Sequence, residues 1–308
     1  MCDRNKFFEP ETRCDTYISA ERKAAWKVML DILEEIVRVC DKYDLPYHLD
    51  GGSMLGAIRH GGIIPWDDDI DIAMFRKDYD RLQEVLPKEL PPHLFMQTAL
   101  TDEEYPIAHL KVRDSRTTGV GIFYAQRRQR FNMGIFVDVF PIDGVPNDAR
   151  ARTRQLRKLK FYLHVRRNIF WHKFGSVFDV LKFVYARMIY CLVGRERLYR
   201  MQEDVCRAYP VDECRECSTG IALWGFKPNN RRRLEWFKEY KEVDFEYLRV
   251  KVPVAAEVIL TTIYGDWHKF VKGASTHGET VLEAHKDYRT FLKENYGYRD
   301  EDFRPLPY

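Results

Sequence analysis

The sequence predicts a mixed α/β (α+β) fold, because helical and extended patterns both recur along its 308 residues. Apolar side chains in the segment 26–40 return at the spacing of a helix with one buried face. The segment 107–113 instead alternates apolar and basic residues, which is typical of a half-buried strand. Residues 148–204 are again helical in character, and they are rich in basic and aromatic side chains.

The elements between these segments follow from local signals. Ser19 can cap the first helix, with Glu21 in its first turn, and Leu45-Pro46 ends that segment. We then expect an extended piece at 47–50, helical turns at 53–59, a strand at 69–74, a helix at 77–86 and a strand at 135–140 that ends at Pro141. Short strands and helices return from residue 236 onward.

Composition and charge exclude several classes of protein. Hydrophobic residues make up 45% of the chain and are spread along its length, which excludes a disordered protein. The net charge of +3 is too small for a protein that binds nucleic acid through its overall charge. The most apolar segment, 177–192, is interrupted by Asp179, Lys182 and Arg187, so it predicts an amphipathic or buried helix rather than a membrane span.

The seven cysteines favour a reducing compartment. Their number is odd, no apolar segment opens the chain, and no Asn-x-Ser/Thr sequon is present. We therefore expect a cytoplasmic protein with free thiols. Cys206, Cys214 and Cys217 are close in sequence, but one CxxC pair without a second pair is a weak zinc signal, and their role stays open.

Four aspartates, Asp67, Asp68, Asp69 and Asp71, crowd the start of the strand expected at 69–74. On a strand, Asp69 and Asp71 project from one face, while the isoleucine that follows each of them anchors the opposite face in the core. Parallel carboxylates on a rigid strand suit Mg²⁺ (or Mn²⁺), which prefers oxygen ligands. A solvated acidic turn is the alternative, but it leaves the isoleucines unexplained, and close carboxylates repel one another without a counter-ion.

A glycine-rich turn, Gly51-Gly52-Ser53, precedes the aspartates and lies between an expected strand and an expected helix. Glycines let the backbone approach a phosphate closely, and the N-terminus of the helix supplies free N–H groups. The tripeptide is common in ordinary turns, but its place just before the acidic segment favours substrate binding. Arg59 and His60, close to both motifs, are further candidates for phosphate contact.

A full metal site needs a third acid, and Asp138 is the candidate that we favour. It lies inside an apolar strand, where an unpaired carboxylate is costly, so we expect a cation partner. Asp143 is the rival, but it follows Pro141 in an expected loop, which favours a turn residue. We therefore expect Asp138, not Asp143, to point toward Asp69 and Asp71. Asp138→Asn should leave the metal-free protein as stable or more so, because one repelling acid is removed.

Two basic groups are further candidates for binding. His109, Lys111 and Arg113 share one face of the strand at 107–113 and could neutralise a pyrophosphate, although an exposed strand edge explains the same pattern. A basic run precedes the aromatic segment 170–192, and basic residues beside an amphipathic helix predict weak peripheral association with the cytoplasmic leaflet, with a solvated charged face as the alternative. The run comprises Arg150, Arg152, Arg154, Arg157, Lys158, Lys160, Arg166 and Arg167.

Several stretches carry a resemblance to a known family: residues 47–60, residues 63–71, Lys111-Val112-Arg113, residues 137–144 and Ile263-Tyr264-Gly265-Asp266-Trp267. Over residues 20–267 the chain resembles the LicD family, which includes bacterial phosphocholine transferases and is related to the fukutin group. Bacterial members often follow the Tyr-Gly-Asp motif with Leu-Pro-Pro. Here residues 268–272 read His-Lys-Phe-Val-Lys instead.

The resemblance implies a nucleotidyltransferase-like core with a mixed sheet and a divalent metal. It further implies a phosphotransferase that moves a phospho-alcohol, such as phosphocholine from CDP-choline, to a glycan hydroxyl and releases CMP. Asp69 and Asp71 match the metal-binding pair, Asp138 matches the third acid, and Asp67 belongs to the same catalytic motif. The implied acceptors are glycans or lipid-linked glycans of the cell envelope, such as polysaccharide, teichoic acid or lipopolysaccharide, and not nucleic acid.

We divide the chain into a catalytic core at 20–150, a helical basic and aromatic region at 151–230, and a C-terminal part of the same domain at 231–308. In the expected reaction the acceptor hydroxyl attacks in line at phosphorus, and Asp138 or Asp67 accepts its proton.

Two other functions stay open: a nucleotidyltransferase that uses a nucleoside triphosphate, and a catalytically silent member that binds glycans or scaffolds an assembly. The alcohol is open too, because choline favours an aromatic cage whereas ribitol needs polar groups. The aromatic candidates are Tyr105, Phe123, Tyr124, Trp224, Phe226 and Trp267.

Overall fold

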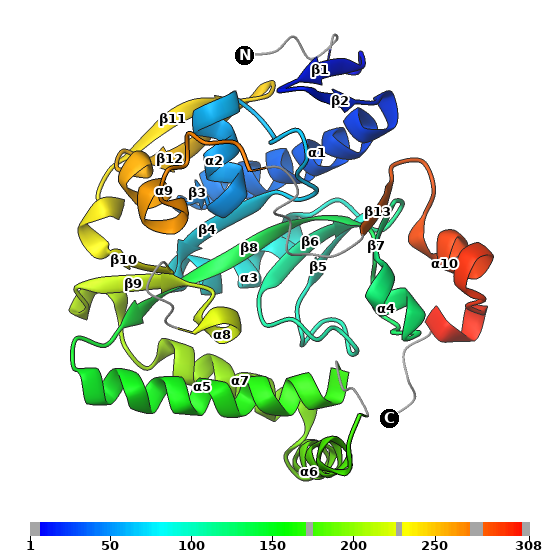
Figure 1. The fold of residues 1–308 in the computed structure, drawn as a ribbon, viewed down its shortest axis with the longest axis vertical. Coiled ribbons are helices and arrows are strands. Elements are labelled where there is room, and N and C mark those ends of the chain that lie inside the picture. The colour runs from blue at the N-terminus through cyan, green and yellow to red at the C-terminus, as the bar shows by residue number, and fades with distance from the viewer. Residues whose placement is uncertain (1–6, 171–174, 226–229, 272–279, 304–308) are drawn as a thin grey trace.

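The computed structural model describes residues 7–170, 175–225, 230–271 and 280–303. In these residues a seven-stranded mixed sheet is surrounded by helices, so the predicted α/β fold is confirmed (Figure 1). The strands of this sheet are β3 (His48–Leu49), β4 (Asp71–Phe75), β5 (Leu94–Gln97), β6 (Leu110–Asp114), β8 (Ile135–Val145), β9 (Glu216–Thr219) and β10 (Arg231–Arg233).

The remaining strands form separate antiparallel pairs, each of two strands. The pairs are β1 (Glu11–Arg13) with β2 (Thr16–Ile18), β11 (Tyr240–Phe245) with β12 (Leu248–Pro253), and β7 (Thr118–Gly121) with β13 (Thr280–Glu283). The helices are α1 (Ala20–Lys42), α2 (Gly51–His60), α3 (Arg76–Glu89), α4 (Ile122–Gln126), α5 (Ala149–Phe170), α6 (Val177–Val193), α7 (Arg195–Arg207), α8 (Ile221–Trp224), α9 (Ala256–Tyr264) and α10 (Tyr288–Tyr296). Short 3-10 turns are η1 (Val211–Glu213), η3 (Leu234–Phe237) and η4 (Asp300–Phe303).

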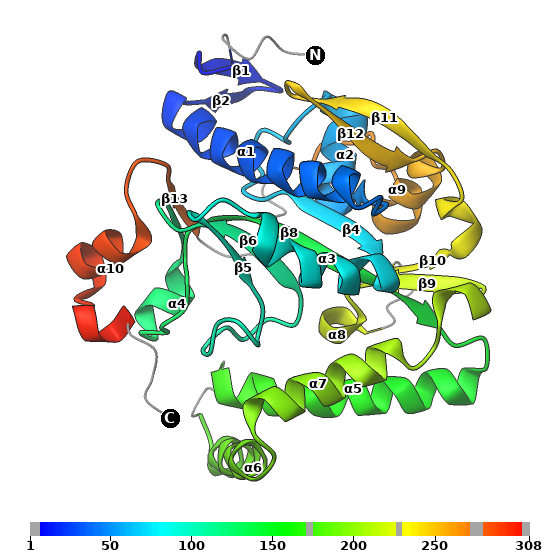
Figure 2. The same ribbon diagram turned by 180° about the vertical axis from the view of Figure 1, so that it is seen from behind.

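The first helix begins where the sequence predicts. The Ser19 hydroxyl accepts a hydrogen bond from the backbone N–H of Arg22 at 3.3 Å, which satisfies one of the free donors of the first turn. Helices α1 and α3 cover one face of the sheet (Figure 2), while α2 and α9 lie on the other side beside the β11–β12 hairpin (Figure 1). The sheet therefore separates the buried face of α1 from the glycine-rich start of α2.

The long strand β8 organises the sheet. It runs parallel to β4 and antiparallel to both β6 and β9. The prediction that this strand ends at Pro141 is wrong, because β8 continues to Val145. Proline lacks an N–H, but the Pro141 carbonyl accepts a hydrogen bond from the Gly220 N–H at 3.1 Å. Beyond Pro141, the residues from Ile142 to Val145 pair with β9.

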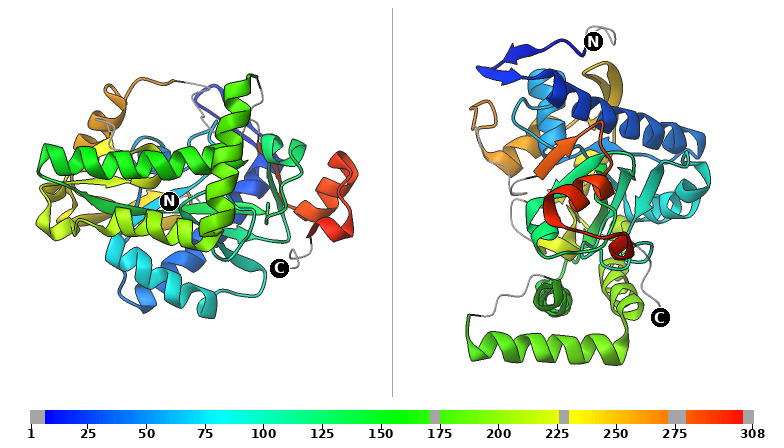
Figure 3. Two further views of the ribbon diagram at one scale, coloured as in Figure 1. Left: turned by 90° about the horizontal axis from the view of Figure 1, so that it is seen from below. Right: turned by 90° about the vertical axis from the view of Figure 1, so that its right-hand side faces the viewer.

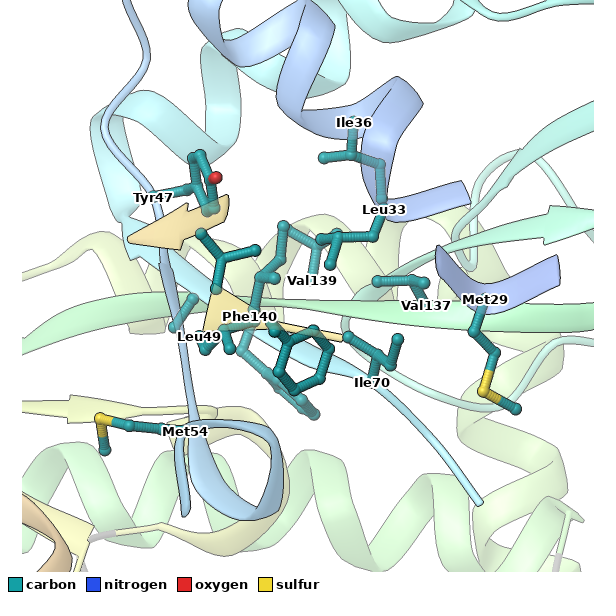
Figure 4. Packing of buried hydrophobic residues seen from close by; sticks show 14 of the residues in the cluster. Met29, Leu33, Ile36, Tyr47, Leu49, Met54, Ile70, Val137, Val139 and Phe140 are labelled. Carbon is teal, nitrogen blue, oxygen red and sulfur yellow. The ribbon is translucent and has the colours of Figure 1, made fainter. Parts of the chain in front are cut away.

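The main hydrophobic core fixes which side chains of β8 face the helices. Met29 and Leu33 of α1 lie in the same buried cluster as Val137 and Val139, and Figure 4 shows these side chains gathered between helix and strand. Because side chains alternate along a strand, the intervening Asp138 projects toward the opposite face. Packing of α1 thus determines the direction of a candidate catalytic acid.

The C-terminal residues belong to the same core. Phe245 and Val250 of the β11–β12 hairpin and Ile259 of α9 are buried in the cluster that α1 and β8 form. The division of the chain at residues 150 and 230 stays a prediction.

The helical region predicted at 148–204 contains α5, α6 and α7, which lie beyond the sheet at one end of the molecule (Figures 1 and 3). Within the described ranges, none of the helices combines the length and the apolarity needed to cross a membrane.

The expectation that Asp143 is a turn residue is wrong. Asp143 lies within β8, is 1% exposed, and accepts two hydrogen bonds from the Arg76 guanidinium, at 2.6 Å from Nε and 2.8 Å from Nη2. Nη1 of the same arginine contacts Glu203 of α7 at 2.6 Å. Burial raises the pKa of Glu203, and the nearby Arg76 opposes that rise. One guanidinium therefore joins the sheet, α3 and the helical region.

We predict that Arg76→Met destabilises the protein by about 3–5 kcal/mol, because it leaves Asp143 buried without its cation and removes the nearer cation of Glu203, whose other partner, Arg207, is 3.5 Å away. Urea unfolding measures the loss. The matched control is Arg81→Met, since Arg81 lies on the same helix, is 53% exposed and, in the described residues, has Glu84 as its only ion-pair partner. The control should cost less than about 1 kcal/mol. Equal losses in the two variants would contradict the role of Arg76.

Candidate active site

The candidate site begins as a row of charged side chains across three adjacent strands. Asp71 on β4 is in register with Asp138 on β8, and Asp138 is in register with Lys111 on β6. Residues directly opposite on neighbouring strands project to the same face, so the two carboxylates and the ammonium come together. The sheet register, not proximity in sequence, assembles this row.

Asp69 joins the row from just outside the sheet. The strand expected to start at Asp69 starts at Asp71 in the structure, although the Asp138 N–H still donates a hydrogen bond to the Ile70 carbonyl at 2.9 Å. Ile70 and Ile72 are both fully buried, as the alternation predicts. One carboxylate oxygen from each of Asp69, Asp71 and Asp138 lies within 4.8 Å of the others.

Asp138 has the cation partner that its burial requires. Lys111 Nζ lies 2.6 Å from Oδ1 and 2.7 Å from Oδ2, and His109 Nε2 lies 2.9 Å from Oδ1. Burial alone would raise the pKa of Asp138, but Lys111 and His109 outweigh it and hold that pKa well below its ordinary value. The carboxylate is therefore ionised and held in place before any ligand arrives.

The basic face of β6 is not an exposed edge. All five residues of β6 are buried, and His109 just before it is 5% exposed. Arg113 donates to Gln97 and, at 2.6 Å, to the Gly134 carbonyl, so it does not reach the other predicted site residues. Lys111 contacts Asp138 instead of lining an open pocket. The prediction of substrate binding by Lys111 and Arg113 is thus not supported by their positions.

The glycine-rich turn packs directly against the acids. Gly51 has a φ of +50°, and a Cβ on Gly52 would lie 2.7 Å from the Asp67 Oδ2 atom. A side chain at Gly52 would therefore displace Asp67, whereas glycine permits the close approach. The hydroxyl of Ser53 is buried and accepts a 2.8 Å hydrogen bond from the Asp71 N–H, so Ser53 positions Asp71 and does not line the cavity.

A cavity of about 450 Å³ opens above these residues. Its lining combines carboxylates, cations and aromatic rings with the two glycines. The charged and polar lining residues are Asp50, Arg59, Asp67, Asp69, Asp71, Asn230, Arg232, Asp266 and Lys269. The aromatic ones are Trp66, Phe140, Tyr264 and Trp267.

Sequence reasoning missed one ion pair in the cavity wall. Arg232 of β10 donates to Asp50, which precedes α2, with Nη1 at 2.5 Å from Oδ1. Both residues are buried, and Arg232 offsets the rise in the pKa of Asp50 that burial would cause. Asp50 was within the recognised motif, but its partner lies 182 residues away, so no local signal could connect them.

Arg59 and His60 are close together but differ in exposure to the cavity. Arg59 lines it, donates to the Trp267 carbonyl at 2.6 Å and lies 4.8 Å from the Phe270 ring centroid. His60 does not line it, and accepts a 3.0 Å hydrogen bond from Arg59 when Nε2 is unprotonated. Burial, with Arg59 and Arg13, lowers the pKa of His60 to about 4. His60 therefore supports Arg59 and is neutral at pH 7.

The carboxylates fit a divalent cation. Asp69, Asp71 and Asp138 present only oxygen donors; Asp69 and Asp138 are buried and Asp71 is half-buried. Asp67 and Asp68 form a second acidic group with Asp69. Such a hard-oxygen set suits Mg²⁺ or Mn²⁺. Each carboxylate oxygen carries two lone pairs, so Oδ2 of Asp138, which Lys111 contacts, has room for a further ligand, whereas both Lys111 and His109 contact Oδ1. Their role as metal ligands stays a prediction.

Other sequence candidates lie elsewhere. Burial raises the pKa of Cys206 and Cys217, which favours neutral thiols, and no acidic, histidine or cysteine group that includes them is arranged for a metal in the described residues. Of the six aromatic candidates for an alcohol cage, Trp267 lines the cavity. The Trp224 side chain and Phe226 lie outside what the structure describes.

Comparison with known proteins identifies the family to which the chain is similar. The family model of the LicD/FKTN/FKRP nucleotidyltransferase domain matches residues 44–142. Over 264 residues the chain is 30% identical to the lipopolysaccharide cholinephosphotransferase LicD of Haemophilus influenzae, covering 84% of this chain and 95% of that protein. Human ribitol 5-phosphate transferase FKRP is 42% identical over 50 residues, 16% of this chain and 10% of that protein. An uncharacterized protein of Rickettsia typhi is 35% identical over 150 residues, 47% of this chain and 42% of that protein.

The contacts of Asp138 change the expected effect of its removal. Asp138→Asn leaves Lys111 buried without its carboxylate, so we now predict a loss of about 3 kcal/mol in the metal-free protein rather than unchanged stability. Chemical unfolding in the presence of a chelator measures this. Lys111→Met in the Asp138→Asn background should recover part of the loss, because the stranded charge is gone. An Asp138→Asn protein as stable as its parent would contradict the importance of the pair.

Proposed function

Because the chain belongs to the LicD family, we propose that it is a metal-dependent transferase that moves a phospho-alcohol from a CDP-linked donor to a glycan hydroxyl, releasing CMP. The observation that carries the proposal is the convergence of Asp69, Asp71 and Asp138 within 4.8 Å, where Asp69 and Asp71 line a cavity that also has cationic walls. Two relatives point to the same class, since they are named as a cholinephosphotransferase and a ribitol 5-phosphate transferase.

We assign the cation site to Asp69, Asp71 and Asp138. A divalent cation bound there would offset negative charge that develops on the donor diphosphate and the leaving CMP. The residues themselves supply rigidity: the Ser53 hydroxyl holds the Asp71 backbone, and Lys111 with His109 holds the Asp138 carboxylate. Preorganised groups of this kind lower the cost of reaching the transition state.

The cations on the cavity wall suit the donor phosphates. Arg59 and Lys269 line the cavity and carry positive charge. Arg232 also lines it but is already paired with Asp50. We therefore assign phosphate binding to Arg59 and Lys269, with Arg232 holding the start of α2. The N-terminus of α2 adds backbone N–H donors at Gly51 and Gly52.

Asp67 is a better proton acceptor than Asp138. Asp67 lines the cavity next to Gly52, where an acceptor hydroxyl can enter, whereas Asp138 is 3% exposed and both of its oxygens contact Lys111. A general base must lie within hydrogen-bond reach of the proton that it accepts. We therefore assign proton acceptance from the attacking hydroxyl to Asp67.

We place the reaction in the cytoplasm, which is consistent with free thiols at the described cysteines.

The function predicts a specific product. Incubation with CDP-choline, CDP-ribitol and CDP-glycerol in the presence of a glycan acceptor and Mg²⁺ should release CMP from one of them, as measured by chromatography. Asp71→Asn should lower that rate by roughly 100-fold or more, because a group that stabilises transition-state charge is lost.

The control is Asp41→Asn, which changes an acid on α1 that is 59% exposed and should leave turnover unchanged. Release of pyrophosphate from a nucleoside triphosphate, without CMP release from any CDP-alcohol, would identify a nucleotidyltransferase instead. Glycan binding without either product would identify a catalytically silent binding protein.

Metal removal gives an independent check. Treatment with a chelator should abolish CMP release, and added Mg²⁺ or Mn²⁺ should restore it, because three clustered carboxylates need a cation to hold the donor diphosphate. Titration calorimetry of Mn²⁺ binding to the parent and to Asp69→Asn should show weaker binding in the variant. Full activity after chelation would refute the role assigned to the acids.

A further inference from the structure

The outward face of α6 is apolar, which is unusual for a helix at a protein surface. Val177, Leu181, Val184, Met188 and Leu192 recur at helical spacing and are between 50% and 78% exposed. Three further residues of this helix, Phe178, Val180 and Tyr185, are large, apolar and exposed. A surface helix normally turns such side chains to the core and shows polar ones to water.

The opposite face of α6 accounts for its position. Ala186 is fully buried, and it shares a small cluster with Val165 of α5 and Leu198 of α7. α6 is therefore attached to the helical region by one stripe of side chains while a second apolar stripe stays uncovered. Contiguous exposed apolar surface of this kind marks an interaction site.

The neighbouring helix α5 supplies charge of one sign. Its residues include eight arginines and lysines and no aspartate or glutamate. The basic residues with exposed side chains are Arg150, Arg154, Arg157, Lys158, Lys160 and Arg167. Arg166, which the sequence pattern groups with them, instead contacts Gln202 and the Ala222 carbonyl, both at 3.4 Å, and is not part of this surface.

Charge on α6 itself does not oppose an anionic partner. Its single acid, Asp179, accepts hydrogen bonds from Ser176 at 2.8 Å and Lys182 at 3.2 Å, close to the start of the helix. The exposed Arg187 adds another cation. Exposed apolar side chains and exposed cations are therefore presented together.

The position of the two helices suits a flat partner. Both lie at the end of the molecule away from the β11–β12 hairpin, with α6 outermost (Figures 1 and 3). Viewed from below, α5 and α6 lie on the same side of the molecule (left part of Figure 3). A second copy of the chain is a poorer occupant, because it would bring two basic helices toward each other.

We infer that α6 and the basic side chains of α5 form a docking surface for an anionic lipid bilayer. Val177, Leu181, Val184, Met188 and Leu192 enter the boundary between headgroups and acyl chains, while the arginines and lysines of α5 contact lipid phosphates. α6 lies in the plane of the interface. This mode agrees with a helix that has an apolar outer face, basic neighbours and too little length and apolarity to span.

Vesicle flotation tests this surface without reference to catalysis. The full-length protein should float with phosphatidylcholine vesicles that contain phosphatidylglycerol, and much less with phosphatidylcholine alone or at high salt. Leu181→Asp/Met188→Asp should weaken binding by about tenfold or more, because it places two charges at the apolar boundary. Arg154→Glu/Arg157→Glu should weaken binding to anionic vesicles by a similar factor.

Matched controls carry the same charge changes elsewhere. Val254→Asp/Val258→Asp alters two apolar side chains that are 51% and 49% exposed on and beside α9, and it should leave flotation unchanged. Arg81→Glu/Arg249→Glu alters two arginines that are 53% and 51% exposed, with the same expectation. Circular dichroism of every variant checks folding.

Three results would overturn the inference: no flotation of the parent protein, flotation that the α6 variant does not reduce, or equal binding to neutral and anionic vesicles. A dimer in sedimentation that Leu181→Asp/Met188→Asp dissociates, without vesicle binding, would assign the surface to a second copy instead. None of the residues that line the cavity lies on α5 or α6, so CMP release in solution and vesicle binding can fail separately.

Discussion

The buried contact between Lys111 and Asp138 is the constraint on which the rest of the site depends. A carboxylate that is 3% exposed needs a cation, and Lys111 of the adjacent strand β6 places its Nζ 2.6 Å from the Asp138 Oδ1 atom. This contact fixes the charge of Asp138 and aligns β6 with β8. The same register places Asp71 on the other side, so the geometry of the acids follows from a single pattern of strand pairing.

Local sequence signals were sufficient for the elements whose causes are local. The Ser19 cap, the buried face of α1 and the isoleucines around Asp71 each follow from spacing and residue type, and the structure has them as expected. The direction of Asp138 could be predicted for the same reason, because apolar neighbours on β8 leave only the alternate face for a charge.

Long-range pairing explains what the sequence could not provide. Asp143 resembled a turn residue because its cation, Arg76, lies 67 residues away in the chain, and the second acid that Arg76 contacts, Glu203, lies 127 residues from Arg76. Arg232 gave no local indication that it would meet Asp50. The basic face of β6 was ambiguous for a related reason, since alternation identifies two faces but not which of them another strand or helix will cover.

β8 carries two buried acids with opposite orientations, and this has a consequence for folding fidelity. Asp138 and Asp143 are separated by an odd number of positions, so they face opposite sides of the sheet and bind different cations, Lys111 and Arg76. A slip of β8 by one residue would turn both carboxylates away from their cations at once. Misregistered pairing of this strand is thereby disfavoured at two separate points.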